Sequence, residues 1–590
     1  MPTTTRQPHF ALLLGLVWLL AVLQLVAQHW IETGRTLIDT DDAMRLTQMY
    51  DWLGGRGWYD LNQPRIAPIG YEAHWSRLID AGLAGTLWIF AWFTDAAFAE
   101  RLMRTVWPAL WLLVAMAGIA ATVWRVAGRN GALLALVLLA VGKPAYAQFL
   151  PGRVDHHNVQ IALSMLLLAA TVWSDRVRWA AAAAGVLTAL ALVIGFECLS
   201  FLVVCGAAMG ARYTFDRAGA RPAADYGLAL AASAAVTFVL VVGPDHRARM
   251  LCDAIAINMT APVIVAGLGL ALAGRIAPQS MGARFGLMLA TGAVAIAVFA
   301  VMEPRCLKGP FGMVDPALAS IWLDHVSELE TFASMTRGSP AMGAGFAAFP
   351  LAGLICALLL MCERELRGDF GFLVSAAMLA AGIGMMLLLV KMSYYTMWFA
   401  MPFVAAVGVR LFDRLKLQSV AARFLLAVLL APAVLTAAAL SVVKAAASAP
   451  SAPQHDMRRE IGCFKSESYA PLASLPAGIV ATDIDFGPFL LKLTPHRILT
   501  APYHRLSANI IAMHRAFAAL PDEARPMLAR LGVTYVVICG RRPPSGLVAP
   551  RVGASLWESL QAGEVPQWLE PVAETQAPFT VYRLKTSAAS

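Results

Sequence analysis

Long apolar runs recur through residues 1–446 of this 590-residue chain, and they constrain its fold more than any other feature. A helix that crosses a bilayer needs about 20 apolar residues. Only 14% of the residues are charged, against about 25% in soluble domains, and the mean hydropathy is +0.64. We therefore predict an all-α polytopic membrane domain with about 13 spans. They lie at residues 9–27, 103–124, 131–149, 158–173, 178–194, 198–210, 226–243, 260–274, 285–302, 344–362, 370–390, 394–410 and 423–445.

Lysine and arginine fall mainly in one alternate set of short loops, such as SDRVR, CERELR and RLFDRLK. Cytoplasmic loops carry this excess of positive charge. Placing these loops inside leaves residues 28–102, 150–157, 303–343 and the tail outside the cytoplasm. One loop, DHRARM at 245–250, is basic although the same count places it outside. The net charge of +9 follows from the inner loops, and we expect no nucleic acid partner.

Two apolar segments have alternative interpretations. Residues 10–27 are expected to be an uncleaved first span, with a signal peptide as the alternative, because no small-residue cleavage pattern follows them. Residues 83–93, LAGTLWIFAWF, are too short to span comfortably, and a span there would invert the charge pattern of every later loop. We expect an interfacial or re-entrant helix at this position.

The tail differs from the rest in composition. Residues 447–590 are more polar, and they are predicted to form a small extracytoplasmic α/β domain after the transmembrane domain, 1–446. An Ala-, Ser- and Pro-rich linker, KAAASAPSAPQ, precedes it. Strand-like stretches (GIVATD, RILTAP, VTYVVIC, FTVYRL) accompany helix-like ones (NIIAMHRAFAAL, DEARPMLARL). Cys463 and Cys539 lie in this domain, where a disulfide is permitted, although the sequence does not fix their pairing.

Three outer loops carry acidic residues close to the membrane. Carboxylates and imidazoles that converge on one pocket suit a divalent cation such as Mg²⁺ or Mn²⁺. For any one acid, the alternative is a solvated surface group. Asp155 is different, because it stands in a very short loop beside two histidines and a span, where an ionisable group is costly. The residues concerned are Asp39, Asp41 and Asp42; Asp155, His156 and His157; and Asp324, His325, Glu328 and Glu330.

Three further features have a functional and a structural interpretation. Glu197 stands between two apolar stretches, either as a functional group or as a helix-end residue at a turn. Lys391, at a span end, either snorkels toward the interface or serves as a cation for a phosphate. The tail element YHRL, residues 503–506, follows a predicted strand and either faces the same pocket as the acids or forms a plain surface loop.

In these motifs the sequence resembles the GT-C glycosyltransferases, and within them the catalytic subunits of oligosaccharyltransferases. DDAMRL resembles the acidic motif of their first outer loop, and GRVDHHNVQ resembles a second acidic motif, in which two histidines follow the acid in archaeal members. HVSELE resembles a loop element that ends in glutamate, here Glu328. ATDIDFGPFLL resembles a degenerate Trp-Trp-Asp-Tyr-Gly element in which Asp483 and Ile484 replace the tryptophans. Since this element grips the acceptor sequon in the family, the departure favours a glycan or lipid acceptor over a protein.

The resemblance implies a membrane glycosyltransferase that uses a polyprenyl phosphate or pyrophosphate donor. The sugar or oligosaccharide would pass, with inversion, to an extracytoplasmic glycan, lipid or protein, and membrane lipids would surround the enzyme in a bacterial inner membrane. A multi-spanning transporter or flippase of lipid-linked glycans is the alternative. Such proteins often show repeated halves, whereas this sequence shows no convincing internal repeat and ends in a folded outer domain.

The resemblance also implies roles for single residues. Asp42 or Asp41 would take the proton of the acceptor, and the long 303–343 loop would be a mobile lid that carries Glu328. A bound Mg²⁺ or Mn²⁺ would stabilise the charge on the leaving phosphate, with positively charged side chains adding to this effect. The implied metal ligands are Asp42, Asp155, His156, His157 and Glu328, and the implied phosphate-binding cations are Arg153, Arg305, Lys308 and Lys391.

Overall fold

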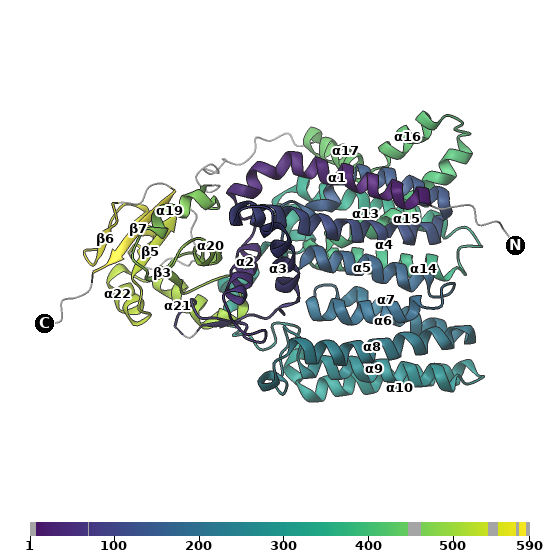
Figure 1. Cartoon of the computed structure of the whole chain (residues 1–590), viewed down its shortest axis with the longest axis horizontal. Coiled ribbons are helices and arrows are strands. Elements are labelled where there is room, and N and C mark those ends of the chain that lie inside the picture. The colour runs from purple at the N-terminus through teal and green to yellow at the C-terminus, as the bar shows by residue number, and fades with distance from the viewer. Residues whose placement is uncertain (1–7, 69, 447–461, 541–552, 574–577, 586–590) are drawn as a thin grey trace.

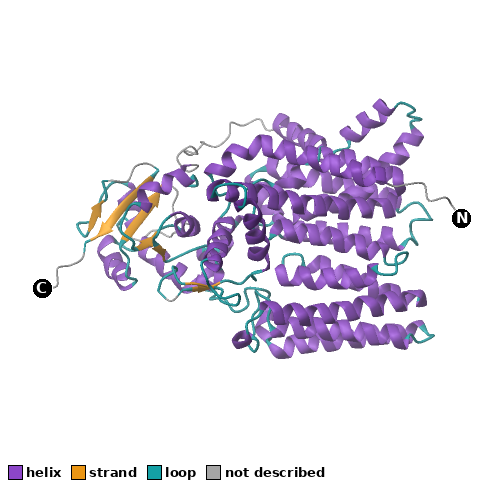
Figure 2. Cartoon of the chain, viewed as in Figure 1, coloured by secondary structure: helices purple, strands orange, loops and turns teal. Residues whose placement is uncertain are grey.

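The computed structural model describes residues 8–68, 70–446, 462–540, 553–573 and 578–585. It has two parts, a bundle of long helices and a small domain with a β-sheet at one end of that bundle (Figures 1 and 2). The segment 447–461, which contains most of the predicted linker, lies outside the described residues. The predicted domain boundary at residue 446 therefore stays a prediction.

The bundle consists of apolar helices that run side by side (Figure 1). Large apolar side chains remain exposed on its outer surface, such as Leu289, Ile296 and Val301 at 64%, 66% and 80%, as expected where lipid is the solvent. The helices are α1 (Pro8–Arg35), α4 (Ala96–Ala140), α5 (His157–Trp173), α6 (Ala180–Ile194), α7 (Leu199–Phe215), α8 (Ala220–Val241), α9 (Ile257–Ile276), α10 (Met281–Met302), α13 (Pro340–Leu360), α14 (Phe370–Leu388), α15 (Ser393–Arg414), α16 (Val420–Leu429) and α17 (Pro432–Ala446).

The prediction of a multi-spanning helical domain is confirmed. Within the described ranges, eight helices are long and apolar enough to cross a membrane by length and composition, and the bent pair α16–α17 makes a ninth if it is one span. Helices α5, α6 and α7 are shorter and apolar. Helix α4 covers one predicted span and part of the next, and Gly128, with φ 68° and ψ −170°, interrupts it between them. The count of 13 spans stays a prediction.

The first outer loop folds against one end of the bundle. It contains α2 (Thr40–Leu53), a short hairpin of β1 (Asn62–Gln63) and β2 (Tyr71–Glu72), and α3 (Leu78–Ala91). The end of α3 and the residues after it, where an interfacial helix was predicted, leave Trp88, Trp92 and Phe93 exposed by 61%, 68% and 78%. Aromatic rings of this kind are typical of membrane–water interfaces.

Other connections between the long helices are short 3₁₀ and α-helical turns. Two matter for the site: η7 (Val390–Met392), which joins α14 to α15, and η6 (Ser327–Leu329) in the long loop. The others are η1 (Lys143–Phe149), η2 (Arg217–Gly219), η3 (Pro244–His246), η4 (Pro304–Lys308), α11 (Ala317–Ile321), η5 (Leu323–His325) and α12 (Phe332–Gly338).

The tail forms a five-stranded sheet in the order β4-β3-β5-β7-β6. The four predicted strand-like stretches become β3 (Ile479–Ala481), β4 (Arg497–Ile498), β5 (Tyr535–Cys539) and β7 (Phe579–Leu584), and β6 (Leu569–Pro571) completes the edge. Strands β3, β4 and β5 are parallel, and β7 is antiparallel to both its neighbours. The helical segments are η8 (Ser466–Tyr469), α19 (Ala470–Ala473), η9 (Ile484–Phe486), α20 (Gly487–Leu493), η10 (His504–Leu506), α21 (Ser507–Ala518), α22 (Pro521–Arg530) and α23 (Leu556–Gln561).

The tail is bound to the first outer loop by polar contacts. Arg65 donates hydrogen bonds to the carbonyls of Leu491 and Thr494, at 2.6 and 3.1 Å. The ammonium of Lys492 lies 3.0 Å from a carboxylate oxygen of Glu100, at the start of α4. These contacts place the tail directly over the outer loops, so both can contribute to one site.

Candidate active site

The first turn of α2 and the short loop before α5 are joined through Asp42. Its Oδ1 accepts hydrogen bonds from the backbone N–H groups of Val154 and Asp155, at 2.7 and 2.9 Å, and its Oδ2 accepts one from Arg153 at 3.2 Å. The side chain is fully buried, and burial raises the pKa of Asp42 to about 6 although Arg153 opposes the shift. Oδ1 thus holds the 154–155 backbone, and Oδ2 holds the guanidinium of Arg153.

Arg153 lies in the same contact rather than at an open surface. Its guanidinium also donates to Asp39 and to Gln148, at 2.7 Å each, and the residue is 6% exposed. Arg153 therefore connects the start of α2 to the loop 148–155. It does not line either of the two large cavities described below.

Asp155, His156 and His157 form a compact cluster at the start of α5. One ligand atom from each lies within 4.8 Å of the others. The Nδ1 of His156 is 2.6 Å from Asp155 Oδ1, and the Nε2 of His157 is 3.2 Å from Asp155 Oδ2. Asp155 Oδ2 is buried and receives no hydrogen bond. A buried carboxylate with an imidazole nitrogen beside each of its oxygens is a donor set that a cation can complete.

A second layer of charges orients this cluster. Glu197, in the turn between α6 and α7, has its Oε2 2.7 Å from Nδ1 of His157. Lys391 in η7 lies 3.3 Å from Glu197 and 3.4 Å from Glu328, and Glu328 Oε1 lies 3.8 Å from His157 Nε2. The N–H of Val390 donates to the carbonyl of Glu330 at 2.9 Å, which keeps the Glu328 turn beside Lys391. Lys391 thus points inward to carboxylates.

Arg45 supports the cluster from the other side, and this role was not predicted, although Arg45 lies in the DDAMRL motif. Its fully buried guanidinium lies 3.1 Å from Asp80 and 3.8 Å from Asp155. It also stacks over the ring of Trp75, 4.6 Å from the ring centre. This buried cation thus ties the Asp80 carboxylate to the Asp155 carboxylate and helps to fix the position of Asp155.

Two cavities lie beside the cluster, and His156 and His157 line the larger one. The larger, about 970 Å³, has mostly apolar walls from α6, α7 and α14. The smaller, about 480 Å³ and more polar, lies between the 322–329 segment and the tail. Asp41, His74, Glu328, Lys391 and His504 line both cavities. The arrangement therefore offers an apolar chamber and a polar chamber with acids and imidazoles at their junction.

The predicted site residues divide into those at this junction and those elsewhere. Asp41 and Glu328 face it, beside the Asp155 cluster, and His504 of the YHRL element does so too. Burial, followed by the neighbouring carboxylates Asp155 and Asp39, raises the pKa of Asp41 well above its usual value. Arg305 pairs with Glu303 at 2.8 Å and Lys308 is exposed; neither lines these cavities.

Several residues at the junction were not predicted from the sequence. His74 and Trp75 come from the first outer loop, and Asp253 comes from the loop before α9. The only sequence signal for them is that each polar group stands in a segment that the count of spans places outside. The smaller cavity also includes Asp485 and Ile484 of the degenerate tail element, with the aromatic rings of Trp322 and Tyr503.

No protein-family model matches this sequence, and no curated protein sequence matches it. Solved structures do resemble the fold. The archaeal oligosaccharyltransferase AglB from Archaeoglobus fulgidus, in complex with an inhibitory peptide and a dolichol-phosphate, aligns with a TM-score of 0.64 at 14% identity over 90% of this chain and 69% of its own. Its apo form aligns with a TM-score of 0.64 at 14% identity, over 90% of this chain and 70% of its own. Its complex with Zn and sulfate aligns with a TM-score of 0.58 at 15% identity, over 89% of this chain and 68% of its own.

At 14–15% identity this likeness establishes the fold, while the activity has to be argued from the site. The alignment includes about nine tenths of the chain. The chain therefore has the fold of this oligosaccharyltransferase, and the predicted resemblance to oligosaccharyltransferase catalytic subunits is confirmed at the level of the fold.

Proposed function

We propose that this protein is a glycosyltransferase that moves a sugar or oligosaccharide from a polyprenyl phosphate or pyrophosphate to an extracytoplasmic acceptor. The observation that carries the proposal is the position of the Asp155, His156 and His157 cluster: its two histidines line the apolar cavity, beside Asp41, Glu328 and Lys391, which line the polar cavity as well. A lipid-linked sugar is divided in the same way, into an apolar prenyl chain, a charged phosphate and a polar sugar.

The donor is assigned to the larger cavity. Its walls include Leu192, Val203 and Met385, from α6, α7 and α14, and apolar side chains of this kind suit a prenyl chain that enters from the bilayer. Lys391 stands where the apolar wall meets the cluster and provides a cation for the phosphate. A similar fold has been solved with a dolichol-phosphate bound, which supports a donor of this class.

The residues present fit a divalent cation. Asp155, His156 and His157 would hold it, and Glu328 is close enough to join them. When bound, the cation supplies Lewis-acid stabilisation of the leaving phosphate. Carboxylates suit Mg²⁺ and Mn²⁺, whereas imidazole suits Zn²⁺; we propose Mg²⁺ or Mn²⁺ at this mixed site, with Zn²⁺ as the ion for comparison in binding experiments. Asp42, whose two oxygens are already hydrogen-bonded, positions the Asp155 backbone instead of serving as a ligand.

Glu197 has a defined part in this arrangement. Because its Oε2 lies 2.7 Å from Nδ1 of His157, it favours the tautomer with the hydrogen on Nδ1, in which Nε2 of that ring is free to ligate. Carboxylate–histidine pairs of this kind are typical behind metal ligands. Of the two aspartates predicted as catalytic, only Asp41 faces the cavities, so Asp41 and Glu328 are the carboxylates that we place beside the transferred sugar.

The acceptor is assigned to the smaller cavity. Its walls combine carboxylates, hydroxyls and aromatic faces, including Asp39, Asp485, Ser327, Trp322 and Tyr503. Carboxylates accept from sugar hydroxyls, and aromatic faces stack on the apolar face of a sugar ring. Together with the absence of both tryptophans from the degenerate element 483–487, this favours a glycan or glycolipid acceptor, with protein as the remaining class.

The side of the membrane is supported by the disulfides. Cys252–Cys306 and Cys463–Cys539 both lie in the loops and tail at the site end of the molecule. Disulfides persist in oxidising compartments such as the periplasm. We therefore infer that the cavities open on the extracytoplasmic side, consistent with a bacterial inner membrane enzyme whose basic loops face the cytoplasm.

The test is sugar transfer by the full-length protein in lipid nanodiscs. The probes are radiolabelled hexoses and pentoses on undecaprenyl phosphate and undecaprenyl diphosphate, offered with membrane glycolipid extracts and, separately, with an Asn-Val-Thr peptide. We expect cleavage of at least one donor, its loss in EDTA and its return with Mn²⁺ or Mg²⁺. Asp155→Ala should abolish cleavage without lowering the amount of protein in the membrane.

Two results would contradict the proposal. Turnover that survives chelation and Asp155→Ala removes the metal-assisted mechanism. If the reconstituted protein cleaves no donor but moves the labelled lipid between the leaflets of a vesicle, the flippase alternative is correct.

A further inference from the structure

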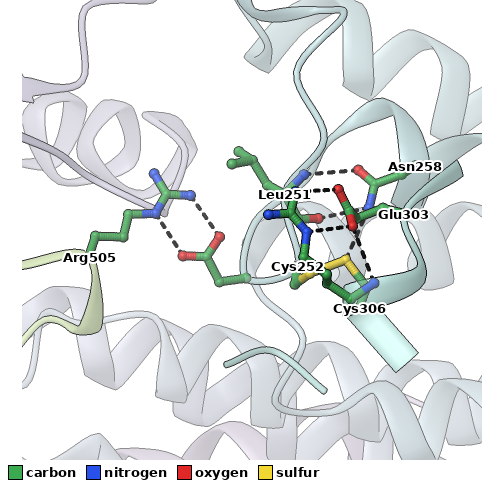
Figure 3. Close-up of a disulfide and its surroundings, with 8 residues drawn as sticks. Leu251, Cys252, Asn258, Glu303, Cys306 and Arg505 are labelled. Atoms are coloured by element: carbon green, nitrogen blue, oxygen red, sulfur yellow. Dashed lines mark hydrogen bonds and ion pairs between the residues drawn. A yellow bond between two sulfur atoms is a disulfide. The ribbon is translucent and has the colours of Figure 1, made fainter. Parts of the chain in front are cut away.

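A covalently fixed loop brings one more carboxylate to the junction of the cavities. A disulfide joins Cys252, just before α9, to Cys306 in η4, just after α10 (Figure 3). The side chain of Asn258 pairs with both backbone groups of Leu251, at 2.9 and 3.0 Å. The loop that carries Asp253 is therefore held on both sides, by a covalent bond and by hydrogen bonds.

Asp253 binds the tail. Arg505 approaches it with two guanidinium nitrogens, at 2.7 and 2.8 Å (Figure 3), and Arg505 also donates to the carbonyls of Glu72 and Ala73. The Nε2 of His504 lies 2.5 Å from Asp253 Oδ2. Burial alone would raise the pKa of Asp253, but the hydrogen bonds from Arg505 and His504 hold it well below the usual value. Asp253 is therefore an ionised acceptor.

The imidazole of His504 is oriented by this contact. An ionised carboxylate on Nε2 fixes the hydrogen on that nitrogen and leaves the lone pair on Nδ1. Among the described residues, Nδ1 has no hydrogen-bond partner. The ring lies between Phe311 and His74, whose ring centres are 5.2 and 5.3 Å away, and it lines both cavities.

The charged groups around His504 are compatible with a proton acceptor. Asp253 and Arg505 lie on its Nε2 side, and His74 faces its ring. Burial, with the charges of His504 and Arg505 nearby, holds the pKa of His74 well below 6.5. His74 is therefore neutral at neutral pH and does not oppose a positive charge on His504, whereas Asp253 stabilises one.

We propose that His504 is a catalytic residue, the base that takes the proton of the acceptor hydroxyl, and that Asp253 is its positioning residue. The inference rests on the proposed glycosyl transfer. As the acceptor oxygen bonds to the anomeric carbon, its O–H bond breaks and the proton passes to Nδ1 of His504. The bond between that carbon and the phosphate oxygen breaks at the same time, and the phosphate leaves with the electron pair.

The position of His504 explains why an imidazole takes this part although a neighbouring carboxylate is present. In an inverting displacement the acceptor attacks from the face opposite the leaving phosphate. Asp41 lies near Asp155, Asp39 and Glu328, and we assign it to the side of the proposed metal and phosphate. His504 belongs to the tail and is bound to the Asp253 loop. We therefore place Asp41 beside the reacting carbon and assign the proton of the acceptor to His504.

The test uses sodium azide, a nucleophile that carries no proton and needs no base. His504→Ala should lower transfer from the undecaprenyl-linked donor that the wild type cleaves by about 100-fold or more, and azide should restore cleavage, with a glycosyl azide of inverted configuration as the product. Asp253→Asn should lower transfer about 10-fold or more. His246→Gln is the matched control: its imidazole also pairs with a carboxylate, Glu72 at 3.1 Å, outside the two cavities, and it should behave as wild type.

His504→Gln covers the case in which the alanine variant does not fold, since glutamine keeps a donor for Asp253 and cannot take the proton. Asp155→Ala should stay inactive with azide, because this variant lacks a proposed metal ligand and not the proposed base. A wild type without turnover of any donor overturns the proposed function and this inference with it. Wild-type turnover that survives both His504 variants, or a loss in folded variants that azide does not restore, overturns the base assignment alone.

Discussion

Asp41 and Asp42 show how neighbouring residues of the same kind receive different roles. Both stand in the first turn of α2, where acidic side chains are favoured by the helix dipole. The helical rotation between them turns Asp42 into the 153–155 backbone and Asp41 toward the cavities. The sequence indicates that DTDD is important but not which carboxylate is engaged, because that depends on a loop more than 100 residues away.

We expect alanine at these two positions to give opposite results. Asp42→Ala leaves the buried N–H groups of Val154 and Asp155 without their acceptor and removes one of the three side-chain acceptors of Arg153; breaking a buried pair of this kind costs about 3–5 kcal/mol. Its thermal stability in detergent and its abundance in the membrane should fall. Asp41→Ala removes a half-buried side chain at the cavity wall and should keep both while losing donor turnover. Equal stability of the two variants would contradict the assignment.

Glu197 provides a test of the metal site that does not depend on activity. Glu197→Gln removes the charge behind His157, and loss of such a partner typically weakens metal affinity by about 10–100-fold. The measurement is the Mn²⁺ dissociation constant of the purified protein by calorimetry. Glu363→Gln is the control. Glu363 also pairs with a basic side chain, Arg410, but that residue lies near the end of α15 that is remote from η7 and the cluster. Unchanged affinity in Glu197→Gln, with binding lost in Asp155→Ala, would remove the orienting role.

At the scale of elements, short connections between long helices build the site. The loop before α5 gives the cluster, η7 gives Lys391, and the Cys252–Cys306 loops fix Asp253. The site draws its side chains from several separate loops, so these loops must also be held relative to one another. Covalent and ionic ties between the loops, such as the disulfide and the Asp253–Arg505 pair, supply that alignment.

We expect the disulfide to hold the Asp253 loop against the tail. Replacing Cys252 and Cys306 together by serine should increase hydrogen exchange in residues 251–256, 303–311 and 503–507, because the loop loses its covalent tie. The other disulfide joins Cys463, just before η8, to Cys539 in β5. Replacing these two cysteines by serine should instead increase hydrogen exchange in the sheet of the tail. Unchanged exchange at 503–507 in the first variant would show that the tail holds the loop without the disulfide.

At the scale of the molecule, the sequence predicted more of the fold than of the site. Hydrophobic length predicted the helical bundle, and alternating apolar stretches predicted four of the five tail strands. The motifs predicted one part of the candidate site, the group of Asp155 and the two histidines that follow it. Arg45, His74 and Asp253 were not assigned roles, because their importance arises from contacts across loops that no local pattern specifies.

The same charge pattern predicts how the molecule sits in the membrane. Arg125 pairs with Asp175 and Asp369 at 2.7 and 2.9 Å, at the end of α5 opposite His157, and free Cys362 is exposed in the neighbouring 361–369 loop. Positive-inside placement puts this end in the cytoplasm. In spheroplasts, a membrane-impermeant maleimide should therefore label Glu523→Cys, on exposed α22 of the tail, and should reach Cys362 only after permeabilisation. Labelling of Cys362 in intact spheroplasts would invert the molecule and place the proposed site on the cytoplasmic side, where its two disulfides would not be expected to persist.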